Sequence, residues 1–350
     1  MKNLLIPCAG KSTRFPNMRP KWLLTHPDGQ LMIAKSMAGL DLGIFDRIII
    51  TIVKSHVEEY EADLILRQAL ASLPDIEICI LDDFTSSVGE TVARSISLMN
   101  IKGGLIIRDS DNFVACPPEL LSGNFVVGIN VADTLVSNLP GKSFIMLNQD
   151  SLITNIVEKR IISSYICLGV YGFEDVSLFE TGYDALSQLD LYGEIYISHI
   201  ISWLITQNGA FFHYAPATAF EDWGTISEWR DIQTRHATIF IDIDGVLFKN
   251  SGRYGSINWS NNNSILIDNV NRIIELQARG AQIILTTSRA ECFRKDLEEK
   301  IASLGIRPYS IIMGLNHSPR ILVNDFAPSN PFPSATAISI PRNMDLRNYL

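Results

Sequence analysis

Residues able to handle phosphate groups follow an apolar run near the start of the chain. The stretch LLIPCAGKSTRF (residues 4–15) leads from that run into a loop that ends in Arg14. The small residues of the loop are Ala9, Gly10, Ser12 and Thr13. Their unencumbered backbone N–H groups can approach triphosphate oxygens closely. Arg14 adds positive charge, and Pro20 fixes the backbone ahead of Lys21, which places an ammonium where it could meet the phosphate under attack.

The letters GKST in this loop also end the phosphate loop of nucleoside triphosphatases, whose full pattern is G-x-x-x-x-G-K-[ST]. That pattern needs a glycine five places before Gly10, and this chain has Leu5 there, inside the apolar run. A kinase built on such a loop is therefore disfavoured. A kinase of this kind would form ADP from ATP.

A second group of chemical residues follows the apolar residues of LIIRDSDNFV (105–114). Asp109 and Asp111 stand two apart, so both side chains can leave the end of a strand on the same side. Acidic residues at strand ends of parallel sheets lie where ligands bind. Carboxylate oxygens of this kind suit Mg²⁺, which bridges phosphate oxygens. The alternative interpretation is an ordinary acidic turn.

These residues need a sheet to position them, and the chain supplies short apolar, β-branched runs separated by polar segments with helical period. The runs read as strands buried on both faces. They lie at residues 47–53, 76–81, 104–108 and 125–132. Segment 55–73 places Val57, Tyr60, Leu64, Leu66 and Leu70 roughly on one side, as expected for a crossover helix. The order of elements predicts an α/β fold with a parallel sheet.

The strand and helix pattern restarts near residue 237, which predicts a second domain. A strand is expected within 237–248, a helix in 263–280, and further strands in 281–289 and 320–327. We place the boundary near Arg235, giving domains of residues 1–235 and 236–350. A chain of 350 residues with 47% hydrophobic content is expected to hold about two domains.

Composition excludes several classes of protein. The 29 basic and 38 acidic side chains give a formal charge of −9 without any Lys/Arg block, which argues against nucleic-acid binding. The five cysteines form no C-x-x-C pair, which argues against a zinc site or a disulfide framework. The apolar run after Lys2 is shorter than the ~7–15 residues of a secretory signal, and no run approaches the ~18 residues of a membrane span. We expect a cytoplasmic protein without membrane partners.

The small-residue loop ending in Thr13-Arg14, followed by Pro20-Lys21, resembles the signature of the sugar-phosphate nucleotidylyltransferases. The resemblance implies a Rossmann-like sheet of GT-A type. It assigns nucleotide binding to the loop residues Ala9, Gly10, Lys11, Ser12 and Thr13, and catalysis to Arg14 and Lys21. Ser12 departs from the family, because many members have glycine there.

Further stretches resemble the same family in the same order. SVGETVARSI (87–96) implies contacts of Gly89, Glu90 and Thr91 with base and ribose, although its alternative interpretation is an ordinary helix N-terminus. The family holds its metal with Asp111, favoured over Asp109, and with Asp222 in FEDWGTISEW. The implied cofactor is Mg²⁺.

The residues that the resemblance assigns to binding of the sugar or polyol phosphate, the acceptor of the reaction, come from two later segments. Glu158 would accept hydrogen bonds from substrate hydroxyls and Lys159 would meet the substrate phosphate. Glu194 begins the segment that resembles the substrate-specificity helix. The family's reaction joins a nucleoside triphosphate to a sugar or polyol phosphate and releases pyrophosphate. The short loop and the Asp-Ser-Asp segment favour CTP, while the base remains open.

IFIDIDGVLF (239–248) resembles the first motif of the haloacid dehalogenase (HAD) superfamily of phosphatases. The resemblance assigns Asp242 as nucleophile and Asp244 as general acid and base. It assigns Thr287 to phosphate contact and Asp325 to an Mg²⁺ site with Asp242 and Asp244. About 110 residues, including a late strand at 337–343, leave no room for a large cap, which implies a small capless HAD-like Rossmannoid domain.

One element of the HAD pattern is missing. The lysine expected before the last acidic motif is absent, so Arg320, or Lys295 or Lys300, would have to supply its charge. A bifunctional enzyme for surface-polysaccharide precursors is the leading hypothesis. The alternative keeps the transferase and makes the second domain an inactive structural or dimerisation module, and a homo-oligomer stays open.

Overall fold

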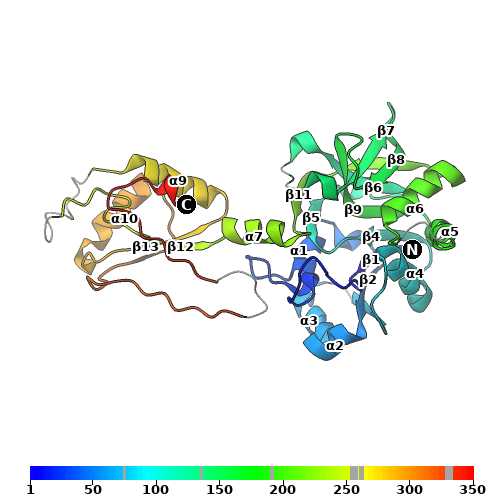
Figure 1. Cartoon of the computed structure of the whole chain (residues 1–350), viewed down its shortest axis with the longest axis horizontal. Coiled ribbons are helices and arrows are strands. Elements are labelled where there is room, and N and C mark those ends of the chain that lie inside the picture. Colours follow the sequence, from blue (N-terminus) through cyan, green and yellow to red (C-terminus); the bar gives the residue numbers. More distant parts are fainter. Residues whose placement is uncertain are drawn as a thin grey trace. The chain divides into compact units, whose positions relative to one another are not determined.

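The computed structural model describes residues 1–73, 76–134, 136, 138–189, 193–252, 259, 264–327 and 334–350 (Figure 1). The chain divides into unit 1, Met1–Trp229, and unit 2, Arg230–Leu350. This division lies slightly before the boundary placed at residue 235, because helix α7 (Ile226–Arg235) spans it.

Unit 1 is organised around a mixed sheet. Among the described residues, nine strands form it in the order β3-β2-β1-β4-β9-β6-β10-β8-β7. Their bounds are β1 Lys2–Pro7, β2 Arg47–Val53, β3 Ile76–Leu81, β4 Gly104–Arg108, β6 Phe125–Asn130, β7 Ser143–Leu147, β8 Leu152–Glu158, β9 Tyr165–Phe173 and β10 Phe212–Pro216. The expected strands at 47–53, 76–81 and 104–108 coincide with β2, β3 and β4.

The prediction of a parallel sheet is correct for one half. Strands β1 to β4 pair in parallel. Strand β9 runs antiparallel to β4 and to β6, and β7 runs antiparallel to β8. Parallel neighbours need a long crossover connection, and the short links that join β7, β8 and β9 do not provide one.

Helices cover both faces of this sheet, so alternate residues of one strand enter different cores. Leu4 and Ile6 of β1 pack in the core beneath α1 (Met32–Met37) and α3 (Ala62–Ala69). Leu5 packs in the other core, which α4 (Val88–Met99), α5 (Val176–Ser187) and α6 (Ile197–Trp203) cover. This period of two is what a strand buried on both faces requires.

The crossover helix expected at 55–73 is interrupted. Glu61 adopts a left-handed backbone conformation (φ 50°) that separates α2 (Lys54–Tyr60) from α3. Leu64 and Leu66 stand two apart within α3, about 200° around the helix axis, so Leu64 is 59% exposed while Leu66 is buried. Placing Leu64 on the buried side was therefore wrong.

A two-stranded ribbon brings the end of unit 1 back to its centre. Strand β11 (Ala219–Asp222) pairs antiparallel with β5 (Asn112–Ala115), and Asp222 lies opposite Asn112. The backbone N–H of Trp223 donates a hydrogen bond to the carbonyl of Asp111 at 3.0 Å. The ribbon thereby fixes Asp222 beside the loop that follows β4.

Unit 2 has a smaller parallel sheet. Its described strands are β12 (Thr238–Asp242), β13 (Gln282–Thr286) and β14 (Ser310–Ile312), paired in that order. Helices α9 (Ile267–Ala278) and α10 (Arg294–Ser303) contribute Ile273 and Leu297 to the core. The expected strand, helix and strand at 237–289 are confirmed in type.

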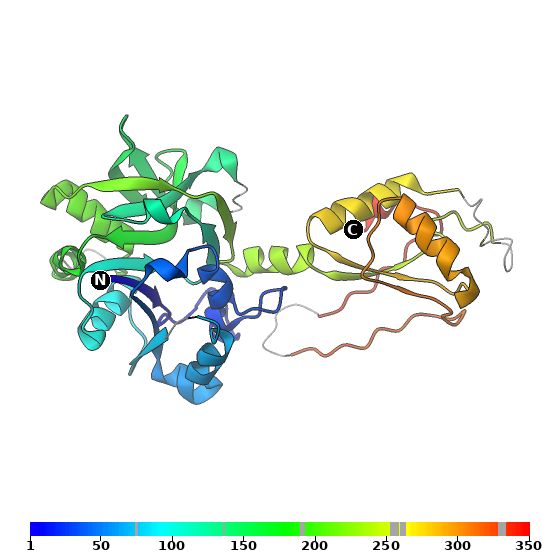
Figure 2. The same ribbon diagram turned by 180° about the vertical axis from the view of Figure 1, so that it is seen from behind.

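The strands expected at 320–327 and 337–343 are wrong. Residues 321–327 form no ladder with β12, and their ribbon carries no strand arrow (Figure 2). Ile321 and Val323 are 86% and 88% exposed. Strand propensity reflects fit to a pleated, half-buried surface, and these residues have no such surface here. Across the part of the chain that the structure describes, no helix has the length and apolar character needed to cross a membrane.

Candidate functional site

A cavity of about 810 Å³ opens in unit 1 at the carboxyl ends of β1 and β4. Its walls come from segments far apart in sequence, including the loop after β1, the turn before α4 and the start of β7. Of the residues named from the sequence, those that line it are Gly10, Lys11, Ser12, Thr13, Arg14, Lys21, Thr91, Asp109, Asp111, Glu158, Lys159, Glu194 and Asp222. Ala9, Gly89 and Glu90 do not line it.

The small-residue loop has a conformation that explains its composition. Ser12 lies in the left-handed region (φ 49°), which glycine adopts most easily. Its hydroxyl accepts a 3.5 Å hydrogen bond from the Lys21 backbone N–H. Ala9 is fully buried, and its carbonyl accepts a hydrogen bond from the backbone N–H of Thr85. Ala9 therefore anchors the loop to the segment before α4.

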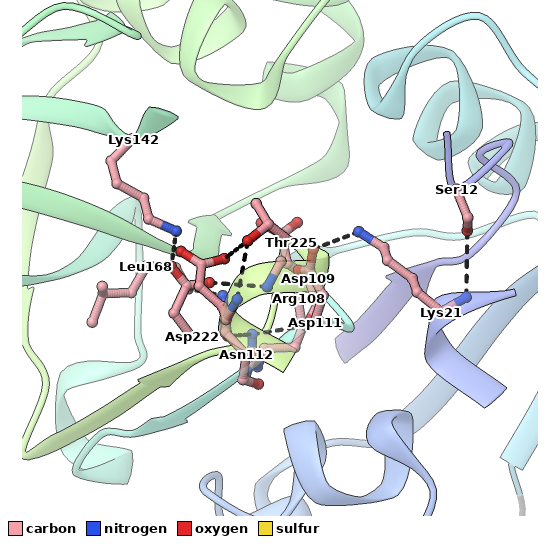
Figure 3. A network of polar contacts seen from close by, with 12 residues as sticks. Ser12, Lys21, Arg108, Asp109, Asp111, Asn112, Lys142, Leu168, Asp222 and Thr225 are labelled. Atoms are coloured by element: carbon pink, nitrogen blue, oxygen red, sulfur yellow. Dashed lines mark hydrogen bonds and ion pairs between the residues drawn. The ribbon is translucent and has the colours of Figure 1, made fainter. Parts of the chain in front are cut away.

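The two aspartates after β4 differ in their surroundings. Asp111 forms an ion pair with the Lys21 ammonium, shown in Figure 3. Burial would raise the pKa of Asp111, but the charge and hydrogen bond of Lys21 outweigh it and lower that pKa to about 2. Burial, and then the negative charge of Asp111, raise the pKa of Asp109 to about 7. Asp111 is therefore the member of the pair that stays charged, which favours it as a metal ligand.

Arg108 organises this acidic loop, and the sequence reading did not single it out. Its side chain is fully buried, and burial lowers its pKa to about 10. One guanidinium nitrogen donates to the Asp109 carbonyl at 2.7 Å, and the other donates to the carbonyls of Ser36 and Asn112 at 3.0 and 2.7 Å. The only sequence feature that could have indicated this role is an arginine at the end of an otherwise apolar strand.

Asp222 faces Asp111 across a small open space. A Cβ added to Gly224 would lie 3.3 Å from an oxygen of each carboxylate. Asp222 is paired with the ammonium of Lys142 (Figure 3), a residue not singled out from the sequence. Burial raises the pKa of Asp222 to about 6, against the opposing charge of Lys142.

The carboxylates around this space are a donor set that suits a divalent cation. Mg²⁺ typically takes one or two carboxylates and completes its shell with phosphate oxygens and water. Asp111 and Asp222 supply two converging carboxylates beside Gly224. No group of three His, Cys, Asp or Glu side chains suited to a metal occurs among the described residues, so the set suits a shared ion better than a closed protein site.

Hydroxyl and carboxylate groups line the opposite wall. Glu158 accepts hydrogen bonds from the hydroxyls of Ser143 and Ser198, the latter at 2.6 Å. Lys159 donates to the Tyr196 hydroxyl at 2.6 Å, and that hydroxyl donates to Glu194. Ser143, Ser198 and Tyr196 were missed from the sequence. Only the position of Tyr196, two residues after Glu194, could have indicated one of them.

The segment expected to contact base and ribose is partly structural. The Glu90 carboxylate accepts from the backbone N–H and hydroxyl of Ser86, both at 2.7 Å, which supports the first turn of α4. A Cβ on Gly89 would meet the Ile195 carbonyl at 3.0 Å, so glycine permits close packing there. Thr91 lines the cavity and its hydroxyl bonds that of Thr85 at 2.6 Å.

In unit 2, Asp242 and Asp244 form a separate acidic pair at the end of β12. Arg289 holds the Asp244 carboxylate with contacts of 2.7 and 3.0 Å, and Thr287 donates to it at 3.0 Å. Partial burial and the charge of Asp244 raise the pKa of Asp242 to about 6, which the charge of Arg320 opposes. Arg320 itself donates to Ser288 at 3.1 Å.

The expected metal site of unit 2 is not assembled. Asp325 lies in the exposed segment after β14, and no three-ligand group that includes it exists among the described residues. The physical reason is the unformed strand at 320–327, which was expected to carry it to Asp242. Arg289, missed from the sequence, is the cation that holds the Asp244 carboxylate. Lys300 lies 4.6 Å from the centre of the Phe248 ring, which Arg289 also contacts.

No protein-family model and no curated protein sequence matches the chain. Solved structures do. A nucleoside-diphosphate-sugar pyrophosphorylase from Vibrio cholerae RC9 matches with a TM-score of 0.56 at 20% identity, over 66% of this chain and 99% of that one. The inositol-1-phosphate CTP transferase from T. maritima matches with a TM-score of 0.50 at 14% identity, over 67% and 95%.

A putative glucose-1-phosphate thymidylyltransferase from Bacillus anthracis matches with a TM-score of 0.51 at 17% identity, over 67% of this chain and 94% of that one. The covered share is close to the size of unit 1, Met1–Trp229. At these identities the likeness shows the fold alone. About two thirds of the chain therefore has a mixed α/β fold that it shares with these nucleotidyltransferase structures.

Proposed function

We propose that the chain is a bifunctional enzyme. Unit 1 transfers a nucleotidyl group from a nucleoside triphosphate, with CTP favoured, to a sugar or polyol phosphate and releases pyrophosphate. Unit 2 is a HAD-like domain that removes phosphate from a related intermediate. Together they serve the synthesis of surface-polysaccharide precursors, with Mg²⁺ as cofactor.

The observation that supports nucleotidyl transfer most directly is that residues proposed for binding and catalysis line one cavity. Arg14 and Lys21 come from the loop after β1, Asp111 from the loop after β4, and Asp222 from β11, yet all line the same space. This arrangement supports phosphate chemistry that depends on positioning and charge neutralisation, as nucleotidyl transfer does.

The roles follow from the wall on which each residue lies. The backbone amides of the small-residue loop and Arg14 bind the triphosphate, and Lys21 meets the α-phosphate. Glu158 and Lys159 hold the acceptor, whose phosphate oxygen forms a bond to the α-phosphorus while the bond to the β-phosphate oxygen breaks. When bound between Asp111 and Asp222, Mg²⁺ supplies neutralisation of the phosphate charge.

A phosphorus NMR spectrum tests this proposal. The protein is incubated with Mg²⁺, a mixture of CTP, GTP, UTP and dTTP, and a panel of sugar and polyol phosphates. Pyrophosphate together with a new diphosphate diester supports the proposal and identifies the base. The inositol-phosphate CTP transferase among the structural neighbours makes CTP with inositol 1-phosphate the first pair to try.

The proposal for unit 2 has a specific rival. Asp242, Asp244 and Thr287 meet at the end of β12 and β13, which supports phosphate-ester hydrolysis. The bidentate hold of Arg289 on Asp244, and the absence among the described residues of a three-ligand group that includes Asp325, favour an inactive module instead. Phosphate release from a phosphate-ester panel that is lost in Asp242→Asn supports hydrolysis, and no release by the wild type supports the module.

A further inference from the structure

Lys142 occupies a position in the cavity that none of the motif assignments includes. It follows the short helical turn Leu139–Gly141 and directly precedes β7. Its carbonyl accepts a 3.0 Å hydrogen bond from the backbone N–H of Lys159. The next pair along the ladder is Ser143 opposite Glu158. Lys142 is thus fixed to the wall that carries the proposed acceptor-binding residues.

The side chain of Lys142 reaches from that wall to the proposed metal ligands. Its ammonium pairs with Asp222, and the two side chains are 18% and 9% exposed. Lys21 reaches Asp111 from the opposite side in the same manner. Each of the two converging carboxylates therefore has its own lysine, one from the nucleotide wall and one from the acceptor wall (Figure 3).

These two lysine–aspartate pairs have an electrostatic consequence when a cation and phosphates bind in the cavity. A cation placed between Asp111 and Asp222 competes with both ammonium groups for the carboxylates, and like charges repel strongly in a poorly solvated space. Without a cation, the ammonium of each lysine can still donate to a phosphate oxygen on its own wall while it pairs with its carboxylate, because an ammonium has three N–H donors. Lys21 extends from the segment that follows the small-residue loop of the proposed nucleotide site, whereas Lys142 extends from the wall that also carries Glu158 and Lys159.

We propose that Lys142 is a substrate-binding residue that holds the attacking phosphate of the acceptor, as the counterpart of Lys21. The identification of this phosphate as the acceptor's rests on the proposed function of unit 1. The backbones of Lys142 and Lys159 pair just outside β7 and β8, and both residues line the cavity, so we assign the same phosphate to both side chains. One of its oxygens forms a bond to the α-phosphorus, the bond from the α-phosphorus to the oxygen that bridges it to the β-phosphate breaks, and the β- and γ-phosphates leave together as pyrophosphate.

Phosphate binding without turnover tests the proposal directly. Inorganic phosphate is titrated by calorimetry into the full chain in buffer free of divalent cations. The chains compared are the wild type, Lys142→Met, Lys142→Arg, Asp222→Asn and the double variant Asp222→Asn/Lys142→Met. Unit 2 is the same in all five, so any phosphate that it binds contributes equally. Lys54→Met, which removes an exposed lysine of unit 1, controls for net charge.

The expected pattern has three parts. Lys142→Met raises the phosphate Kd about tenfold, equal to about 1.4 kcal/mol, and Lys142→Arg restores it to within a few fold because its charge remains. Asp222→Asn frees Lys142 and lowers the Kd several fold. Adding Lys142→Met to Asp222→Asn removes this gain.

Two results would overturn the proposal. One is a Lys142→Met curve that matches that of Lys54→Met. The other is an equal Kd for Asp222→Asn and the double variant, which would mean that Lys142 acts only through Asp222. Neither result depends on nucleotidyl transfer, whose failure would appear separately as the absence of pyrophosphate. In an active enzyme, the KM for the acceptor rises in Lys142→Met while the KM for the nucleotide changes little.

Discussion

The ammonium of Lys21 and the carboxylate of Asp111 form an ion pair inside the cavity of unit 1, although 90 positions separate them in the chain. The pair joins the loop after β1 to the loop after β4. It lowers the pKa of Asp111 to about 2 and keeps that carboxylate charged. The two halves of the proposed chemistry, phosphate binding and metal binding, are therefore in direct contact.

Lys21→Met is expected to abolish most nucleotidyl transfer. Removing one positioned charge from a transition state typically costs about 10²- to 10³-fold in rate, and we expect a loss of at least about 100-fold in kcat. The measurement is the rate of pyrophosphate release. Lys35→Met, which removes a lysine that pairs with Asp28 outside the cavity lining, is the matched control. A kcat for Lys21→Met within a few fold of that control would contradict the assignment.

Arg108→Lys is expected to destabilise unit 1 although the charge is kept. An ammonium cannot reach the Asp109, Ser36 and Asn112 carbonyls at once. The buried acceptors left without partners cost at least about 2 kcal/mol. Urea unfolding followed by tryptophan fluorescence reports mainly on unit 1, which contains Trp22, Trp203, Trp223 and Trp229. An unchanged midpoint would show that Arg108 does not support the loop.

Ser12→Gly is expected to be tolerated, because glycine adopts the left-handed conformation of Ser12 without steric cost. Relief of that cost, about 1 kcal/mol, exceeds the loss of a long 3.5 Å hydrogen bond to the Lys21 N–H. Ser12→Val adds a β-branched side chain at the same φ and should destabilise unit 1. Equal unfolding midpoints for the two variants would refute this account of the loop.

His56 is expected to make the stability of unit 1 depend on pH. Burial lowers the pKa of His56 to about 4, and the ring packs between Trp22 and Phe84, which line the cavity. The folded protein then binds this proton less readily than the unfolded chain, whose pKa is near 6.5. Stability is full above about pH 6.5 and is lost as the pH falls towards 4, by up to ~3 kcal/mol.

His56→Phe removes the titrating group and keeps an aromatic ring, so its loss of stability between pH 6.5 and 4 should be smaller than that of the wild type. The measurement is a set of urea midpoints across this range. His317→Gln replaces an exposed histidine of unit 2 and serves as the control. Parallel pH profiles for the wild type and His56→Phe would exclude His56 as the cause.

The sequence predicts the parts of this molecule that depend on local pattern. Strands β2, β3 and β4 were located because runs such as RIIITIV have no alternative to burial on both faces. The sequence also singled out Gly10, Lys11, Ser12, Thr13 and Asp111, which line one cavity, because such residue types are concentrated in short motifs. The assignment of Glu90 stays a prediction, because a carboxylate near a helix start serves a cap as readily as a ligand, and here it accepts hydrogen bonds from Ser86.

The remaining features depend on partners distant in the chain. Lys142 becomes notable only because strand pairing places it beside Lys159 and its side chain meets Asp222. Arg289 likewise becomes notable only once it meets Asp244. The segment at 320–327 has the composition of a strand, yet composition does not supply a neighbouring strand. Single-sequence patterns contain no information on such pairings.

The fate of the α-phosphorus tests the central claim most directly. The nucleotide identified by phosphorus NMR is supplied with radiolabel at the α- or at the γ-phosphate, together with its acceptor and Mg²⁺. The account predicts that α-label enters the new diester and that γ-label leaves in pyrophosphate, in the wild type and not in Lys21→Met. Transfer of γ-label to the acceptor would contradict it, because that result identifies a kinase.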